Sequence, residues 1–128
     1  MAVARFTSAS AVAPGDAVYV TAGGQAQRAI AKNAAQASVV GIAMESGYAG
    51  SLVPVNLDAV AVNYAGLTPG TPLYLSIVTS GLLVPYSGWS QEFAVVSGDS
   101  YLTFVGRCVS SSGLSVEISP PRLIAYSG

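Results

Sequence analysis

Short apolar runs recur along the whole chain, often alternating with polar positions, and Gly or Pro separates nearly all of them. Within 59–64, for example, Val60, Val62 and Tyr64 fall on one side of an extended chain and their neighbours fall on the other. A period of two is typical of β-strands, and no long segment carries the period of an amphipathic helix. The pattern therefore predicts an all-β protein, either a small antiparallel β-barrel or a sandwich.

Two segments depart from the strand pattern. Residues 31–37 are rich in alanine and predict one or two turns of helix. Residues 86–98 have no clear period, and we expect an irregular loop around Trp89, the only tryptophan. In such a loop the indole would either cover the core or stand exposed as an anchor for a partner, and the sequence leaves both open.

The strand pattern occurs twice. Each half begins with a Pro-Gly turn and a strand centred on tyrosine, continues with a strand that carries a central Val-Gly, and ends with a short alternating strand. The matching segments are 13–20 and 68–75, 39–43 and 104–108, and 52–57 and 114–118. A repeated turn-and-strand unit is typical of a structural scaffold.

The repeat predicts a single β domain over residues 13–118, made of two similar turn-strand units at about 13–57 and 68–118. Residues 1–12 lack a clear period, and we expect an extended N-terminal arm there. Residues 119–128 begin with two prolines after the first serine, which favours an extended C-terminal tail. The apolar side chains on so short a tail need a second subunit or a larger partner to cover them.

Composition narrows the choice of partners. Charged residues make up 9% of the 128 residues, against about 25% in an ordinary soluble domain. Few charges leave much uncharged surface, so we expect a homo-oligomer. The net charge is −1 and the basic residues are scattered, which argues against binding to nucleic acid. No polybasic, amphipathic or long apolar segment indicates a membrane partner or a secretory signal, so we expect synthesis in a cytoplasm.

The residues that usually perform chemistry are scarce. Histidine is absent, and Cys108 is the only cysteine, in an apolar run where it should pack as a small hydrophobe. The acidic residues fall in turns or beside apolar neighbours, which is typical of solvated positions. A carboxylate pair such as Asp16 and Asp58 could still meet in the fold. We predict no catalytic residue, no cofactor and no metal site.

The order of the motifs resembles one known group of proteins. The segments 13–20, 39–43, 67–76 and 104–106 follow the order and spacing found in small head-decoration (cement) proteins of tailed bacteriophages and in related head-fibre structural proteins. This resemblance implies a β-rich subunit, often a trimer, on the outer surface of a capsid. It would clamp neighbouring subunits of the major capsid protein against the pressure of packaged DNA. The expected location is the virion exterior after synthesis in the host cytoplasm.

In that setting the two terminal arms and Trp89 are the candidate contacts with neighbouring subunits. The residues of this expected interface are Arg5, Phe6, Trp89, Pro120, Pro121, Arg122, Leu123, Ile124 and Tyr126. The alternative function is a receptor- or glycan-binding module of a phage head or tail fibre. Tyr86, Trp89 and Tyr101 would then line a shallow aromatic site.

Overall fold

The computed structural model describes residues 3–61, 64–96 and 100–124. The strands, in chain order, are β1 (Val3–Thr7), β2 (Ala17–Val20), β3 (Ala26–Arg28), β4 (Gly41–Ala43), β5 (Leu52–Asn56), β6 (Val60–Ala61), β7 (Pro72–Leu75), β8 (Leu83–Pro85), β9 (Ser100–Leu102), β10 (Phe104–Cys108), β11 (Leu114–Val116) and β12 (Arg122–Ile124). The helices are α1 (Ala34–Ala37) and α2 (Tyr86–Val95).

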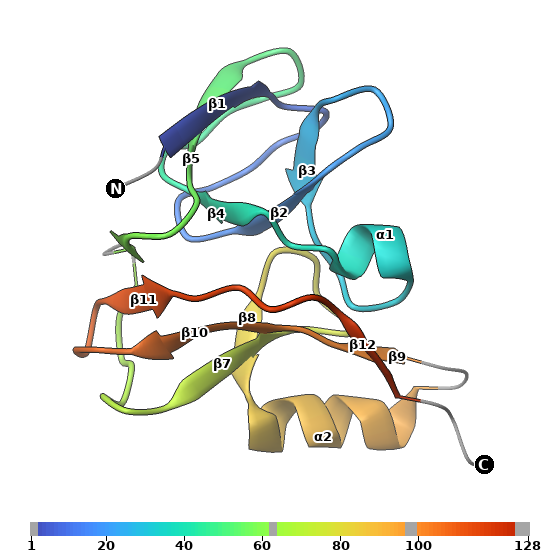
Figure 1. Ribbon diagram of the computed structural model, residues 1–128, viewed down its shortest axis with the longest axis vertical. Coiled ribbons are helices and arrows are strands. Elements are labelled where there is room, and N and C mark those ends of the chain that lie inside the picture. The colour runs from blue at the N-terminus through green and yellow to red at the C-terminus, as the bar shows by residue number, and fades with distance from the viewer. Residues whose placement is uncertain (1–2, 62–63, 97–99, 125–128) are drawn as a thin grey trace.

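The strands form two stacked sheets and a small ribbon (Figure 1). The first sheet has the order β1-β5-β4-β2-β3, and the second has the order β6-β11-β10-β7-β8. Strands β9 and β12 form the ribbon, which continues from β10 and β11. All neighbouring strands in these sheets are antiparallel. The prediction of an all-β fold is confirmed, in the form of a sandwich and not of a closed barrel.

The two sheets follow one plan. Strands β1, β2, β3, β4 and β5 of the first sheet correspond, in this order, to β6, β7, β8, β10 and β11 of the second. With this correspondence the two strand orders are the same. The turns agree as well, because the N–H of Gly15 donates to the carbonyl of Ala43 at 2.9 Å and that of Gly70 to Cys108 at 2.7 Å. Gly15 and Gly70 have φ angles of 93° and 91°, which explains why each Pro-Gly turn needs its glycine. The repeat in the sequence therefore corresponds to a duplicated structural unit.

Close packing between strands also requires glycine in the two Val-Gly strands, at Gly41 and Gly106. A Cβ on Gly41 would overlap the carbonyl oxygen of Asn56 on β5, and a Cβ on Gly106 would overlap that of Ser115 on β11. In each half the neighbouring backbone approaches too closely for any side chain at this position. The same glycine thus has the same role in both units.

The larger core cluster joins the halves. It contains Ala17 and Ile42 from the first sheet together with Leu75 and Leu114 from the second. A smaller cluster includes Val18, which lies between Ala17 and Tyr19 on β2 and faces the other side of that strand. The first sheet is therefore buried on both of its faces at β2.

Neither described part of the predicted arms is a free extension. Residues 3–7 form β1 and pair with β5, and Phe6 packs against the smaller core cluster. Residues 122–124 form β12 and pair with β9, and Ile124 packs against the larger cluster. These residues are extended, as expected, but they pair within the sheets and do not project from the domain, because the sheets offer them backbone partners and apolar cover. Tyr126 lies outside the described residues.

The expectation of an irregular loop at 86–98 is also wrong, because residues 86–95 form α2. Tyr86, Trp89 and Phe93 lie one helical turn apart and stack in sequence, with ring centroids 6.0 Å and 5.2 Å apart. The indole N–H of Trp89 donates to the carbonyl of Tyr101 at 3.1 Å, and the side chain is 3% exposed. Of the two roles left open for Trp89, the structure has it cover the core. The short helix expected within 31–37 is confirmed as α1, which Asn33 caps.

Candidate functional site

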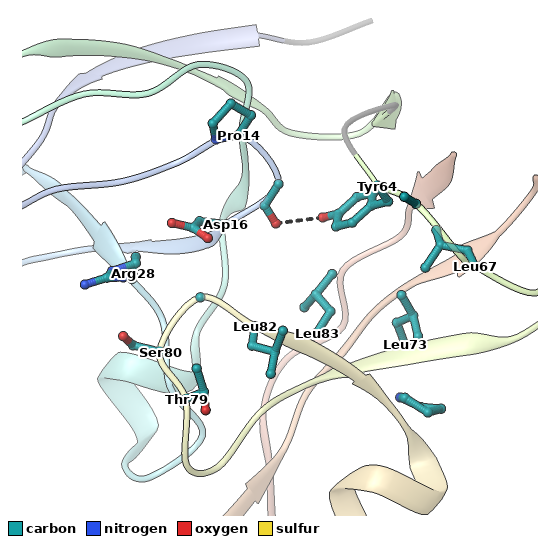
Figure 2. Close-up of a pocket in the computed structure, with 14 residues that line it drawn as sticks. Pro14, Asp16, Arg28, Tyr64, Leu67, Leu73, Thr79, Ser80, Leu82 and Leu83 are labelled. Carbon is teal, nitrogen blue, oxygen red and sulfur yellow. Dashed lines mark hydrogen bonds between the residues drawn. The ribbon is translucent and has the colours of Figure 1, made fainter. Parts of the chain in front are cut away.

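A groove of about 510 Å³ opens between the two halves of the molecule (Figure 2). The turn at Pro14–Asp16 and Arg28 of β3 form its side in the first half. The connection from β7 to β8, at residues 79–83, forms the opposite side, and Tyr64 and Leu67 lie at one end. The groove is thus built by segments that are far apart in the sequence.

The β7–β8 turn reaches the first half through Gly81. The N–H of Gly81 donates to the carbonyl of Ala29 at 2.7 Å, and the N–H of Ala17 donates to the carbonyl of Gly81 at 3.0 Å. A Cβ on Gly81 would press against Asp16 and Arg28 at 3.1 Å, and its φ angle of 79° also favours glycine. Gly81 therefore fixes the distance between the two sides of the groove.

Tyr64 links the halves at one end of the groove. Its hydroxyl donates to the carbonyl of Gly15 at 2.8 Å, as Figure 2 shows. Burial raises the pKa of the Tyr64 phenol far above its usual range, and the negative charge of Asp16 adds to this rise. The phenol is therefore protonated at neutral pH and can donate this hydrogen bond.

Two side chains of opposite charge, Asp16 and Arg28, line the groove. Asp16 accepts a hydrogen bond from the N–H of Ala13 at 2.9 Å, within the Pro-Gly turn. Burial raises the pKa of the Asp16 carboxyl, while the Ala13 N–H and the positive charge of Arg28 act in the opposite direction. The remaining lining is mostly apolar and includes Leu73 and Leu82. Such a groove suits an uncharged apolar group better than an ion.

The described residues offer little for catalysis. They contain no group of three or more Cys, Asp or Glu side chains placed to hold a metal ion. Cys108 is 2% exposed, and burial raises the pKa of its thiol, so the reactive thiolate is disfavoured. Within the same part of the chain, no helix has the length and apolar character needed to cross a membrane.

Glu92 has a structural role that sequence reasoning missed. Its carboxylate accepts hydrogen bonds from the hydroxyl of Ser76 at 2.9 and 3.0 Å and from the N–H of Ile77 at 2.8 Å. The Ser76 hydroxyl in turn accepts bonds from the N–H groups of Val78 and Thr79. Glu92 therefore attaches α2 to the turn that forms one side of the groove.

The residues expected at an interface do not form one site. Strand β1 belongs to the first sheet and β12 to the ribbon beside the second, in separate parts of Figure 1, so Arg5 and Phe6 lie apart from Arg122 and Leu123. Arg5, Pro120, Arg122 and Leu123 are exposed, whereas Phe6, Pro121 and Ile124 are half-buried and Trp89 is buried. The exposed members remain available for contacts, in two separate places.

Sequence reasoning did not find the groove. The sequence places Asp16 in a turn, where the structure has it, but its position beside Gly81 and Arg28 depends on how the two halves pack. The alternating pattern places Tyr64 on the face of a strand and gives no sign of its bond to Gly15. The repeat itself was the usable signal, because duplicated units that share a core must meet at a seam.

The comparisons with known proteins add no relative. No model of a protein family matches this chain, and no curated protein has a significantly similar sequence.

Proposed function

We propose that this chain is a non-enzymatic structural protein of a bacteriophage particle. It decorates the outer surface of the capsid as a homo-oligomer, with a trimer favoured, and stabilises the shell by clamping neighbouring major capsid subunits. The proposal starts from the order of sequence motifs shared with decoration proteins. The structural observation that carries it is the nature of the surface.

That surface combines few charges with many exposed apolar side chains. Only 9% of the residues are charged. Large apolar side chains are exposed on both halves, and Tyr48 and Val95 are 79% and 82% exposed. The others are Val3, Leu52, Val60, Val78, Leu82, Tyr86, Val109 and Leu123. A surface of this kind is stabilised when other subunits cover it, and an oligomer seated on a shell covers more than one face at once.

The connection between the halves suits a protein under mechanical load. Besides the shared apolar core, the hydroxyl of Thr103 donates to the carbonyl of Ala37 at 2.9 Å, and the N–H of Ala31 donates to that of Ser76 at 3.0 Å. These bonds join segments separated by many residues, so one half cannot move away without breaking them. A clamp needs this resistance, because it has to transmit force between the subunits that it touches.

The glycan-binding alternative loses its central residue. The ring of Trp89 stacks with the rings of Tyr86 and Phe93, and the residue is 3% exposed, which leaves little face for a sugar. Tyr86, at 54% exposed, is the member of that proposed site that remains accessible. A Tyr86→Ala variant is therefore the better probe of recognition: intact particles that lose attachment to cells would favour the alternative.

The copy number of the chain tests the proposal. Quantitative mass spectrometry of purified phage particles would compare this chain with the major capsid protein. A ratio near one, or a simple symmetric fraction of it, is the expected result. A handful of copies per particle would point to a tail or fibre, and absence from particles would refute the virion assignment.

A further inference from the structure

The two halves differ at one seam, although their strand orders match. In the first half, the segment after β1 passes beside β3 and forms a single bridge with it. Ser8 forms a parallel bridge with Ala26, and the N–H of Ala9 donates to the carbonyl of Ala26 at 2.8 Å. The edge of β3 is therefore occupied by the chain itself.

Leu83 on β8 is the counterpart of Ala26 on β3. Ala26 pairs with Val20 across the β2–β3 ladder. The next pair along is hydrogen-bonded, because the N–H of Thr21 donates to the carbonyl of Gln25. In an antiparallel ladder, hydrogen-bonded and non-hydrogen-bonded pairs alternate, so Val20 and Ala26 form a non-hydrogen-bonded pair. The N–H and carbonyl of Ala26 therefore point away from β2. Leu83 is opposite Leu75, next to the equivalent bond from Ser76 N–H to Leu82.

Consequently, the N–H and carbonyl of Leu83 also point away from the ladder, toward the outer edge of β8. Among the described residues, no backbone group outside the β7–β8 ladder bonds to Leu83. Leu83 instead lines the groove, as does Leu67, which lies across the seam from it (Figure 2). The place that Ser8 and Ala9 fill in the first half is thus an opening in the second.

The lengths of two connections explain this opening. The N–H of Ser8 donates to Ser51, between β4 and β5, and the N–H of Leu67 donates to Ser111, between β10 and β11, so each residue holds its connection to the neighbouring turn. Six residues separate Ser8 from the turn glycine Gly15, whereas two separate Leu67 from Gly70. The second half therefore lacks the residues that would reach β8.

We propose that the seam between Leu67 and Leu83 accepts an extended, apolar segment of a partner protein, which adds as a strand along the outer edge of β8. The first half shows the geometry, because Ser8–Ala9 runs parallel to β3 at the equivalent position. The groove of about 510 Å³ receives the side chains of the segment, and its size is within the range of about 300–1,000 Å³ common for binding sites.

The chemistry of the groove defines the segment. Main-chain bonds to Leu83 provide attachment, and the apolar lining, which includes Leu73 and Leu82, selects apolar side chains. The positive charge of Arg28 already acts on the Asp16 carboxyl at the groove. A charged side chain of the partner would therefore find little further electrostatic stabilisation there. This inference does not rest on the virion proposal, since it holds for any partner that presents such a strand.

The chain supplies its own probe. A synthetic peptide with the sequence of residues 7–11, in which leucine replaces Ser8 and Ser10, is acetylated and amidated at its ends. It reproduces the backbone that closes the first seam, leaves out most of the strand that pairs with β5, and carries the apolar side chains expected to enter the groove. Titrated into the full-length, isotope-labelled protein, it should cause saturable NMR shift changes at Leu67, Leu83 and their neighbours. N-methylation of the peptide at the position of Ala9 removes the donor, and affinity should fall about tenfold.

Two protein variants provide the matched control. Leu83→Pro removes the outward N–H without removing a ladder bond, and Leu83→Val shortens the side chain but keeps that N–H. We expect about tenfold weaker binding for the first and a change of less than about twofold for the second. If Leu83→Pro does not fold, the methylated peptide tests the other main-chain bond, the one to the carbonyl of Leu83, on the unaltered protein.

Three results would overturn the proposal. The first is the absence of saturable shifts at these residues with millimolar peptide. The second is equal binding of the peptide and its methylated form. The third is a concentration-dependent change at the same residues without peptide, which would assign the seam to a second copy of this chain.

Discussion

Replacing Gly106 by alanine should separate two strands of the second sheet. The added Cβ would overlap the carbonyl oxygen of Ser115 and lie 3.1 Å from Cγ of Leu114, so a rotamer change cannot relieve the clash. Overpacking costs about 1–3 kcal/mol, and each ladder bond that is lost costs about 1 kcal/mol more. We expect the free energy of unfolding to fall by about 2–4 kcal/mol, a large part of the roughly 5–15 kcal/mol typical of a domain.

Gly41→Ala tests the same contact in the first sheet, where the Cβ would overlap the carbonyl oxygen of Asn56. Because the two units are equivalent, the two losses should be similar. Gly23→Ala is the control: its nearest neighbour, Oγ1 of Thr21, would lie 3.9 Å away, so a change within about 0.5 kcal/mol is expected. The assay is urea unfolding followed by circular dichroism. A loss at Gly41 or Gly106 no larger than that of Gly23→Ala would refute the close approach of these strands.

Three further predictions concern side chains with assigned roles. Glu92→Gln should lower the free energy of unfolding by about 1–3 kcal/mol, because the bonds from Ser76 and Ile77 lose a charged acceptor; unchanged urea unfolding would contradict this role. Asp16 has a raised pKa in the folded state, so its contribution to stability declines as pH rises from about 4 through the folded pKa and stays low above it. Asp16→Asn should remove this decline and be at least as stable as the unaltered protein at neutral pH, and a steeper pH dependence of thermal unfolding would contradict the assigned cause. Cys108 should react with a maleimide only after unfolding, since it is 2% exposed; rapid labelling of the native protein would show that the thiol is accessible.

The strands and their turns were largely predictable, because alternation and Pro-Gly pairs act locally. The sequence does not predict the helix at 86–95, because its serine, glycine and aromatic residues are weaker helix formers than alanine or leucine. The stack of Tyr86, Trp89 and Phe93 outweighs that weak propensity. The spacing of these aromatic residues at three and four positions was visible in the sequence and should have indicated a helix.

The terminal strands and the groove could not be predicted in the same way. β1 has alternating exposure, but its inner face carries the small Ala4 beside Phe6 and its outer face carries the apolar Val3, so the hydrophobic pattern is weak. β12 is defined by its pairing with β9, a partner known only from the fold. The groove depends on the difference between two connections, from Ser8 to Gly15 and from Leu67 to Gly70. That difference has meaning only once the strands of the two halves have been matched.

We propose that this chain stabilises a capsid by binding across its subunits. The most direct test uses phage particles that lack the chain and measures the temperature at which they release DNA, with and without added purified protein. We predict saturable binding to the shell and a rise in the release temperature that follows occupancy. Absence of binding, or binding that leaves the release temperature unchanged, would contradict the account.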